Sequence, residues 1–140
     1  EQVMAYKTQG IALVLLMLVA GMSIANHQNG HVDVTVDTDQ LSDRALKGQE
    51  VFNIRCAVCH GTNGSGTPAG PPLIHTIYNP NHHDNNSFSR AVTKGVQQHH
   101  WSYGNMPAQA GVGFSELSAI LAFVREVQVF NGVLPAAHSM

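Results

Sequence analysis

Both cysteines of this 140-residue chain lie in the segment CAVCH at residues 56–60, directly before a glycine-rich stretch. A disulfide between Cys56 and Cys59 would close a tight, strained loop, so a structural bridge is the weaker explanation. A zinc site needs two further ligands; nine histidines supply candidates, but no second C-x-x-C pair accompanies the first. A thioredoxin-type redox pair belongs in a βαβ context, which the sequence lacks. Each of these three explanations is therefore weaker than one in which His60 and both thiols act together.

C-x-x-C-H is the attachment signature of c-type haem. In that chemistry the two thiols add to the vinyl groups of the porphyrin, and the adjacent histidine becomes the proximal ligand of the iron. We therefore predict one covalently bound haem c, attached through Cys56 and Cys59, with His60 as an iron ligand.

The pattern of apolar residues predicts a small all-α domain with long loops and almost no strands. We expect helices over about 43–55, 88–94 and 115–130, with Ser42 and Ser115 as the N-caps of the first and the last. Such short helices bury little surface, while ordering a residue costs about 1–2 kcal/mol. A haem would therefore complete the core.

Gly48 lies in the middle of the first predicted helix, where glycine lowers helix stability by about 1 kcal/mol relative to alanine. It shares one helical face with Leu41, Ala45 and Phe52, at spacings of four, three and four residues. A helix tolerates glycine most readily where another backbone approaches closely. We therefore predict that a second helix crosses the first at Gly48.

Met106 is the candidate for the second axial iron ligand, because the only other methionine after His60 is the terminal Met140. It lies in a polar loop, and the fixed φ of Pro107 stiffens the turn that presents the thioether. Core filling is the usual role of methionine and remains the alternative. Ligation by His99 or His100 would instead give a bis-His haem with a lower reduction potential.

An uncharged, largely apolar run, GIALVLLMLVAGMSIA, occupies residues 10–25. About 20 apolar residues cross a bilayer, so we expect a retained transmembrane helix that starts near Ala5. A cleaved signal peptide with Lys7 as its charged end is the alternative. The predicted segments are a membrane anchor or uncleaved signal over 1–25, an acidic linker over 26–40, a haem domain over 41–132 and a tail over 133–140.

Residues 41–131 resemble the class I cytochrome c family, and the chain is similar to its mono-haem, membrane-anchored bacterial members. Besides C-x-x-C-H, the resemblance rests on Gly48 with Phe52, the loop Gly70-Pro71-Pro72-Leu73, the pair Met106-Pro107, and Ile120 with Phe123. It implies a cytochrome c fold, in which the N- and C-terminal helices cross and long loops and a short middle helix surround the haem. It also implies that the carbonyl of Pro71 accepts a hydrogen bond from His60.

The distal side departs from the family pattern because its loops are unusually rich in histidine. The residues whose roles stay open are His75, His82, His83, His99 and His100. The resemblance also suggests a role for Trp101, whose indole N–H would hydrogen-bond a haem propionate; simple packing is the alternative.

The resemblance implies a one-electron carrier rather than an enzyme, with no small-molecule substrate. The formal net charge of −2 indicates no nucleic-acid surface and no strongly basic docking ring. We therefore expect a cytochrome tethered to the inner membrane, with its haem domain on the periplasmic face. Its expected partners are respiratory or photosynthetic membrane complexes. A gas-sensing module and an enzyme subunit with an open iron, served by His99 or His100, are the alternatives.

Overall fold

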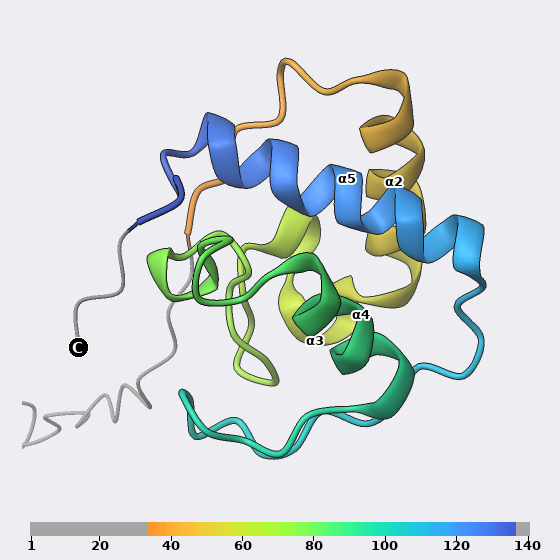
Figure 1. Ribbon diagram of the computed structural model, residues 1–140, viewed down its shortest axis with the longest axis vertical. Helices are drawn as coiled ribbons and strands as arrows, with labels where there is room; N and C mark the ends of the chain where they lie inside the picture. The colour runs from red at the N-terminus through yellow and green to blue at the C-terminus, as the bar shows by residue number, and fades with distance from the viewer. Residues whose placement is uncertain (1–33, 137–140) are drawn as a thin grey trace, which may run out of the picture.

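The computed structural model describes residues 34–136, and these residues fold as predicted into an all-α domain with long loops (Figure 1). Their α-helices are α2 (Asp43–Arg55), α3 (Ala57–His60), α4 (Asn85–Lys94) and α5 (Phe114–Phe130), and their short 3-10 turns are η1 (Thr62–Gly64) and η2 (Thr76–Tyr78). Within these residues, β-pairing is limited to two isolated bridges.

Helix α2 has the start and the end that the sequence predicts. The hydroxyl of Ser42 accepts a hydrogen bond from the backbone N–H of Ala45 at 3.2 Å, which satisfies one donor of the first turn. The helix buries Ala45, Gly48 and Phe52, the face that the spacing of four, three and four residues indicated. The predicted helix over 43–55 is therefore confirmed.

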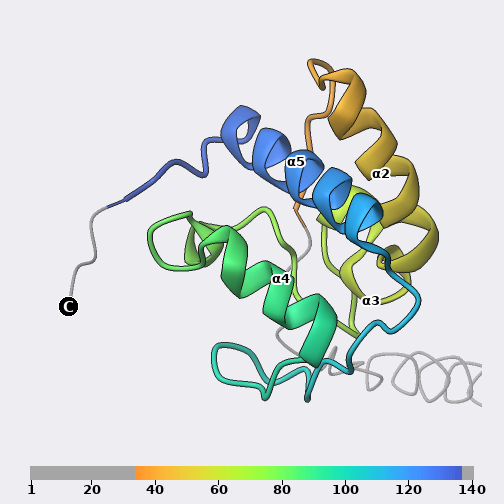
Figure 2. The ribbon, with the colours of Figure 1, turned by 45° about the vertical axis from the view of Figure 1, so that its right-hand side comes forward.

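Helices α2 and α5 cross, and their contact forms most of the core (Figures 1 and 2). A Cβ atom on Gly48 would lie only 2.0 Å from the carbonyl oxygen of Ala119, so the two backbones touch there. Beside this point the ring centroids of Phe52 and Phe123 are 5.3 Å apart. The predicted crossing at Gly48 is confirmed, and glycine is present because any side chain would collide with the backbone of α5.

Replacing Gly48 by alanine is therefore expected to lower the free energy of unfolding of the haem-loaded protein by about 1–3 kcal/mol, the usual cost of overpacking. Chemical denaturation measures the change. Gly111→Ala is the matched control, because the nearest atom there is the flexible end of the Arg55 side chain. Equal stability of the two variants would contradict a close contact between the backbones of α2 and α5.

Two predicted helix starts are wrong by a few residues. Helix α4 begins at Asn85 rather than near Phe88, because the carboxylate of Asp84 accepts a hydrogen bond from the N–H of Ser87 and acts as the N-cap. Helix α5 begins at Phe114, so Ser115 lies inside it.

The N-cap position of α5 belongs to Gly113, which has no side chain with which to cap the helix. The carboxylate of Glu116 instead reaches back and accepts a hydrogen bond from the N–H of Gly113 at 2.9 Å. Glutamate at this position is the second half of a capping box, and here it does the capping alone.

The chain before α2 follows the surface of the domain in an extended conformation. Val34 and Val36 pack against the core, and the N–H of Val34 donates to the carbonyl of Ser65 at 2.9 Å. Because valine alternates with polar residues here, every second side chain faces the domain. Residues 34–40 nevertheless form no β-strand.

The candidate anchor over residues 1–25 lies outside the described residues. Within residues 34–136, no helix has both the length and the apolar character that crossing a membrane requires.

Candidate haem site

The C-x-x-C-H segment forms a tight helical turn at the end of α2. Cys56 ends α2 and starts the one-turn helix α3, whose last residue is His60. Both cysteines are free thiols; Cys56 is half-buried and Cys59 is exposed. Burial raises the pKa of the Cys56 thiol, although the charge of Arg55 opposes this shift. The turn therefore brings two unpaired thiols and an imidazole to one place.

A hydrogen bond to the carbonyl of Pro71 fixes the ring of His60. The Nδ1 atom of His60 lies 2.9 Å from this oxygen. A carbonyl only accepts hydrogen bonds, so Nδ1 carries the proton and Nε2 keeps a free lone pair. Burial also lowers the pKa of His60, against the opposing effect of this hydrogen bond, and thus favours the neutral ring. A neutral imidazole held through its other nitrogen is the usual form of a metal-ligating histidine.

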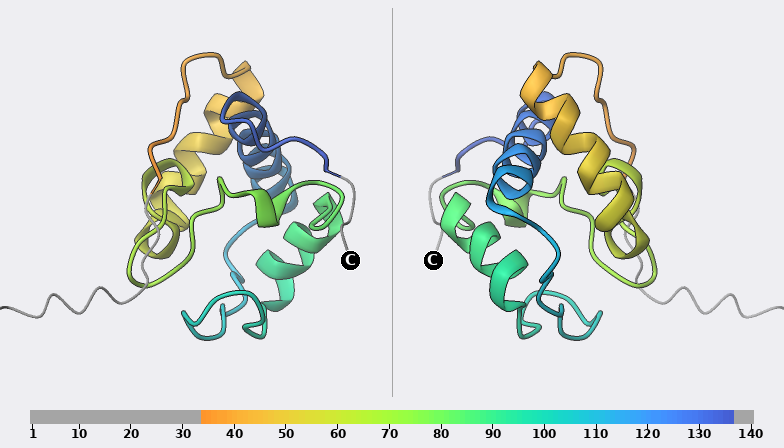
Figure 3. Two further views of the ribbon diagram at one scale, coloured as in Figure 1. Left: turned by 90° about the vertical axis from the view of Figure 1, so that its left-hand side faces the viewer. Right: turned by 90° about the vertical axis from the view of Figure 1, so that its right-hand side faces the viewer.

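A cavity of about 680 Å³ opens beside His60, within the range typical of cofactor pockets. Side chains from α2, α4, α5 and the loop before η2 form its apolar walls, including Phe52, Leu73, Phe88, Val92, Ile120 and Val124. Helix α4 and the loop after it lie below the α2–α5 pair in the two side views (Figure 3). The predicted site residues that line this cavity are Cys56, His60, Pro71, Trp101 and Met106, whereas the exposed Cys59 is not among its lining residues.

Met106 is held in the cavity wall by its backbone. Its N–H and its carbonyl form a pair of hydrogen bonds with Val96, each 2.9 Å long. Gly95 makes this pairing possible: its φ is +78°, and a Cβ atom there would lie 2.5 Å from the carbonyl oxygen of Met106. The short bridge thus holds the half-buried Met106, which is far from His60 in the sequence, against the same cavity.

The indole N–H of Trp101 donates a hydrogen bond to the hydroxyl of Tyr78 at 3.0 Å. Both residues line the cavity, and burial raises the pKa of Tyr78 to about 12, so its hydroxyl stays protonated. The contact between Trp101 and a haem propionate stays a prediction, and in this structure Tyr78 is the partner of the indole.

Sequence reasoning missed Arg125 and Gln128, which support the cavity wall from α5. The guanidinium of Arg125 donates to the carbonyls of Tyr78 and His83, and also to the side chain of Gln128. The fully buried Gln128 in turn donates to the carbonyl of Leu73 at 2.9 Å. A spacing of three residues on one helix indicates that Arg125 and Gln128 can contact each other. It does not reveal which loop carbonyls they bind.

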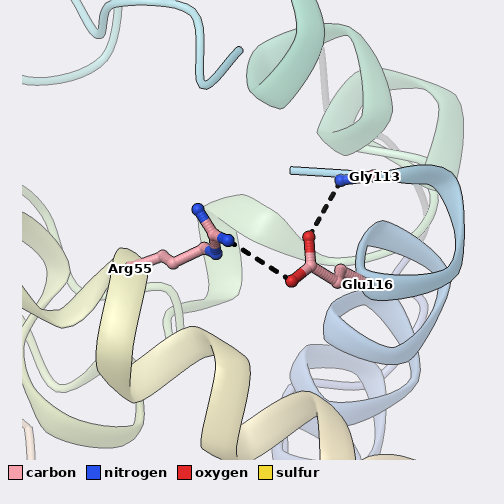
Figure 4. Close-up of polar contacts among 3 residues, drawn as sticks. All are labelled: Arg55, Gly113 and Glu116. Carbon is pink, nitrogen blue, oxygen red and sulfur yellow. Dashed lines mark hydrogen bonds and ion pairs between the residues drawn. The ribbon is translucent and has the colours of Figure 1, made fainter. Parts of the chain in front are cut away.

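An ion pair joins the end of α2 to the start of α5 next to Cys56. Arg55 lies 3.5 Å from the carboxylate of Glu116, whose other oxygen caps α5 through Gly113 (Figure 4). Both charged side chains are substantially exposed, so the pair contributes about 0–1 kcal/mol. The pair links the last turn of α2 to the first turn of α5.

The fold and this site together define a small helical haem-binding domain. The family model of cytochrome c matches residues 45–128, more than half of the chain, and the chain belongs to this family. It is accordingly an electron-transfer haem protein that carries covalently bound haem c with its iron. Comparison with curated proteins gave no match, and neither did comparison with solved structures.

The residues of the site fit this cofactor. The cavity is large and mainly apolar, as a porphyrin requires, and Cys56 lies in its wall. His60 offers one ring nitrogen with a free lone pair, because the other donates to Pro71. Met106 lines the same cavity, and its thioether is a neutral group of the kind that can ligate haem iron.

Proposed function

We propose that this protein transfers single electrons through a haem whose iron is ligated by His60 and Met106. Bound haem supplies an iron that changes between Fe(II) and Fe(III) by one electron. The observation that carries the proposal is that Met106 and His60, from distant parts of the chain, line one cavity together with Cys56. Thioether ligation favours the reduced iron and raises its potential relative to a bis-His site.

The side chains of the site suit a carrier that changes little between its oxidation states. The hydrogen bond between His60 and Pro71 fixes the orientation of the imidazole. The bridge to Val96 fixes the backbone of Met106, and most of the surface that lines the cavity is apolar. Two fixed ligands leave no iron position for a substrate, so electron transfer needs little rearrangement.

Bis-His ligation is the second candidate, because His99 and His100 also line the cavity. Both histidines are exposed, whereas Met106 is half-buried and its backbone is paired. These differences favour Met106. A gas-sensing role would require the bond from Met106 to the iron to be labile.

We also propose that residues 1–25 tether the protein to the inner membrane, with the haem domain on the periplasmic face. The uncharged run at 10–25 supports this tether, and so does the near-neutral net charge of −2. A freely diffusing carrier gains from strong charge steering, whereas a tether provides an effective concentration of roughly millimolar near its partners. The proposed partners are the electron donor and acceptor among membrane-bound redox complexes.

Extraction of membranes in mild detergent tests the tether. Native electrophoresis with haem staining is followed by intact-mass analysis of the stained chain. We expect haem on a chain that still carries residues 1–25. Migration with a large assembly would identify a built-in subunit, and migration alone would identify a tethered shuttle. A haem-bearing chain that begins at Asn26 would contradict the tether while leaving the electron-transfer function intact.

A further inference from the structure

Two histidine pairs, far apart in the sequence, meet at the edge of the cavity. His82 and His83 follow η2, and His99 and His100 follow α4. One ligand atom from each of His82, His83 and His100 lies within 4.8 Å of those of the other two. We propose that these three histidines form a second metal site, separate from the haem iron, for a transition-metal dication such as Zn²⁺ or Cu²⁺.

The spacing of the ring nitrogens fits a metal centre. The Nε2 atoms of His82 and His100 are 3.3 Å apart. In tetrahedral coordination, a Zn–N bond of 2.0–2.1 Å separates two ligand nitrogens by about 3.3–3.4 Å. The separation of these two nitrogens is thus that of two zinc ligands, and the 4.8 Å limit leaves His83 a gap of at most about 1.5 Å to close.

The surrounding backbone fixes the tautomer of His83. Its Nδ1 atom donates to the carbonyl of Ile77 at 2.8 Å, so its Nε2 atom is the free ligand. Such a second hydrogen bond typically orients a ligating histidine. Arg125 holds the same loop by donating to the carbonyls of Tyr78 and His83. The ring of His83 is therefore already oriented before an ion arrives, and only a short approach to the other two rings remains.

The donor set favours a borderline transition metal over Ca²⁺ or Mg²⁺. All three donors are imidazole nitrogens, which suit zinc, copper and nickel, whereas calcium and magnesium prefer oxygen. The nearby carboxylate of Asp84 already caps α4.

The site has an entry path and a free coordination position. His82 and His100 are exposed, so an ion reaches them from solvent. Three protein ligands leave a fourth tetrahedral position for water or for His99, whose ring centre is 4.2 Å from that of His100. The positive charge of Arg125 opposes a dication, so we expect micromolar rather than nanomolar affinity.

The experiment uses the full, haem-loaded chain without an affinity tag, because these histidines also line the haem cavity. Calorimetric titration with Zn²⁺ is expected to show one bound ion per chain. His82→Ala and His100→Ala are each expected to weaken binding at least about tenfold. His75→Asn is the control: it removes a nearby histidine outside the cluster, and its amide oxygen replaces the Nδ1 atom that accepts from the N–H of Ile77.

Electron paramagnetic resonance of the protein with one equivalent of Cu²⁺ provides a second readout, in which we expect imidazole nitrogens as the copper ligands. Three results would overturn the proposal. The first is no binding at micromolar Zn²⁺, and the second is equal loss of affinity in His82→Ala, His100→Ala and His75→Asn. The third is a change in the haem absorption spectrum of His82→Ala or His100→Ala without added metal, because that residue would then serve the haem iron.

Discussion

Replacement of both Cys56 and Cys59 by alanine is expected to abolish covalent haem attachment and, with it, the cooperative folding of the domain. Without the cofactor the cavity of about 680 Å³ has nothing to fill it. The apolar walls of the cavity would then face water, which removes a large part of the burial that stabilises so small a helical domain. The net stability of a typical domain is only about 5–15 kcal/mol, so such a loss is decisive. The fold is therefore not expected to survive loss of its haem.

Haem staining after denaturing electrophoresis measures attachment, and circular dichroism during chemical unfolding measures the fold. Val58→Ala is the matched control, because Val58 lies inside the same motif and is 79% exposed. It should keep both the haem and the cooperative transition. A double cysteine variant that unfolds cooperatively with native helix content, yet carries no haem, would contradict the role of haem as the centre of the core.

Met106→Leu is expected to lower the reduction potential by roughly 0.1–0.3 V, a fraction of the about 0.8 V over which axial ligands tune haem. Leucine keeps most of the volume of methionine but has no sulfur to ligate the iron. Loss of the thioether removes its preference for Fe(II) and opens one coordination position. A redox titration followed by absorbance measures the shift, and binding of carbon monoxide to the reduced variant measures the open position.

Met106→His separates the effect of the ligand from that of packing. A histidine at this position is expected to restore two axial ligands and to block carbon monoxide, while the potential stays below that of the native protein. If Met106→Leu kept the native potential and still excluded carbon monoxide, Met106 would not be the ligand. His99 or His100 would then be the first candidates.

The sequence predicts best those features that depend on local pattern. The start of α2 follows from a serine before an apolar periodicity, and the crossing at Gly48 follows from a glycine that a helix tolerates only at a close contact. The starts of α4 and α5 were mispredicted because several capping residues compete there. Asp84 and Gly113 occupy the N-cap positions, and the side chain of Glu116 caps α5 from within the helix.

Contacts between distant loops were beyond the reach of sequence patterns. Arg125 and Gln128 bind backbone carbonyls, which every loop offers, so no residue type reveals their partners. The meeting of His82 with His100 likewise depends on how the loops after η2 and α4 pack on the domain. The sequence showed that these loops are rich in histidine, and the structure shows which of the rings lie together.

The measurement that tests the central claim most directly is a spectroelectrochemical titration of the native, haem-loaded protein under argon and again under carbon monoxide. A carrier whose iron keeps both His60 and Met106 as ligands should give one reversible wave with a slope of about 59 mV per tenfold change in the ratio of oxidised to reduced protein. The midpoint should be the same under both gases. A midpoint that rises under carbon monoxide would show an iron open to ligands, and would contradict a dedicated electron carrier in favour of a gas-binding module.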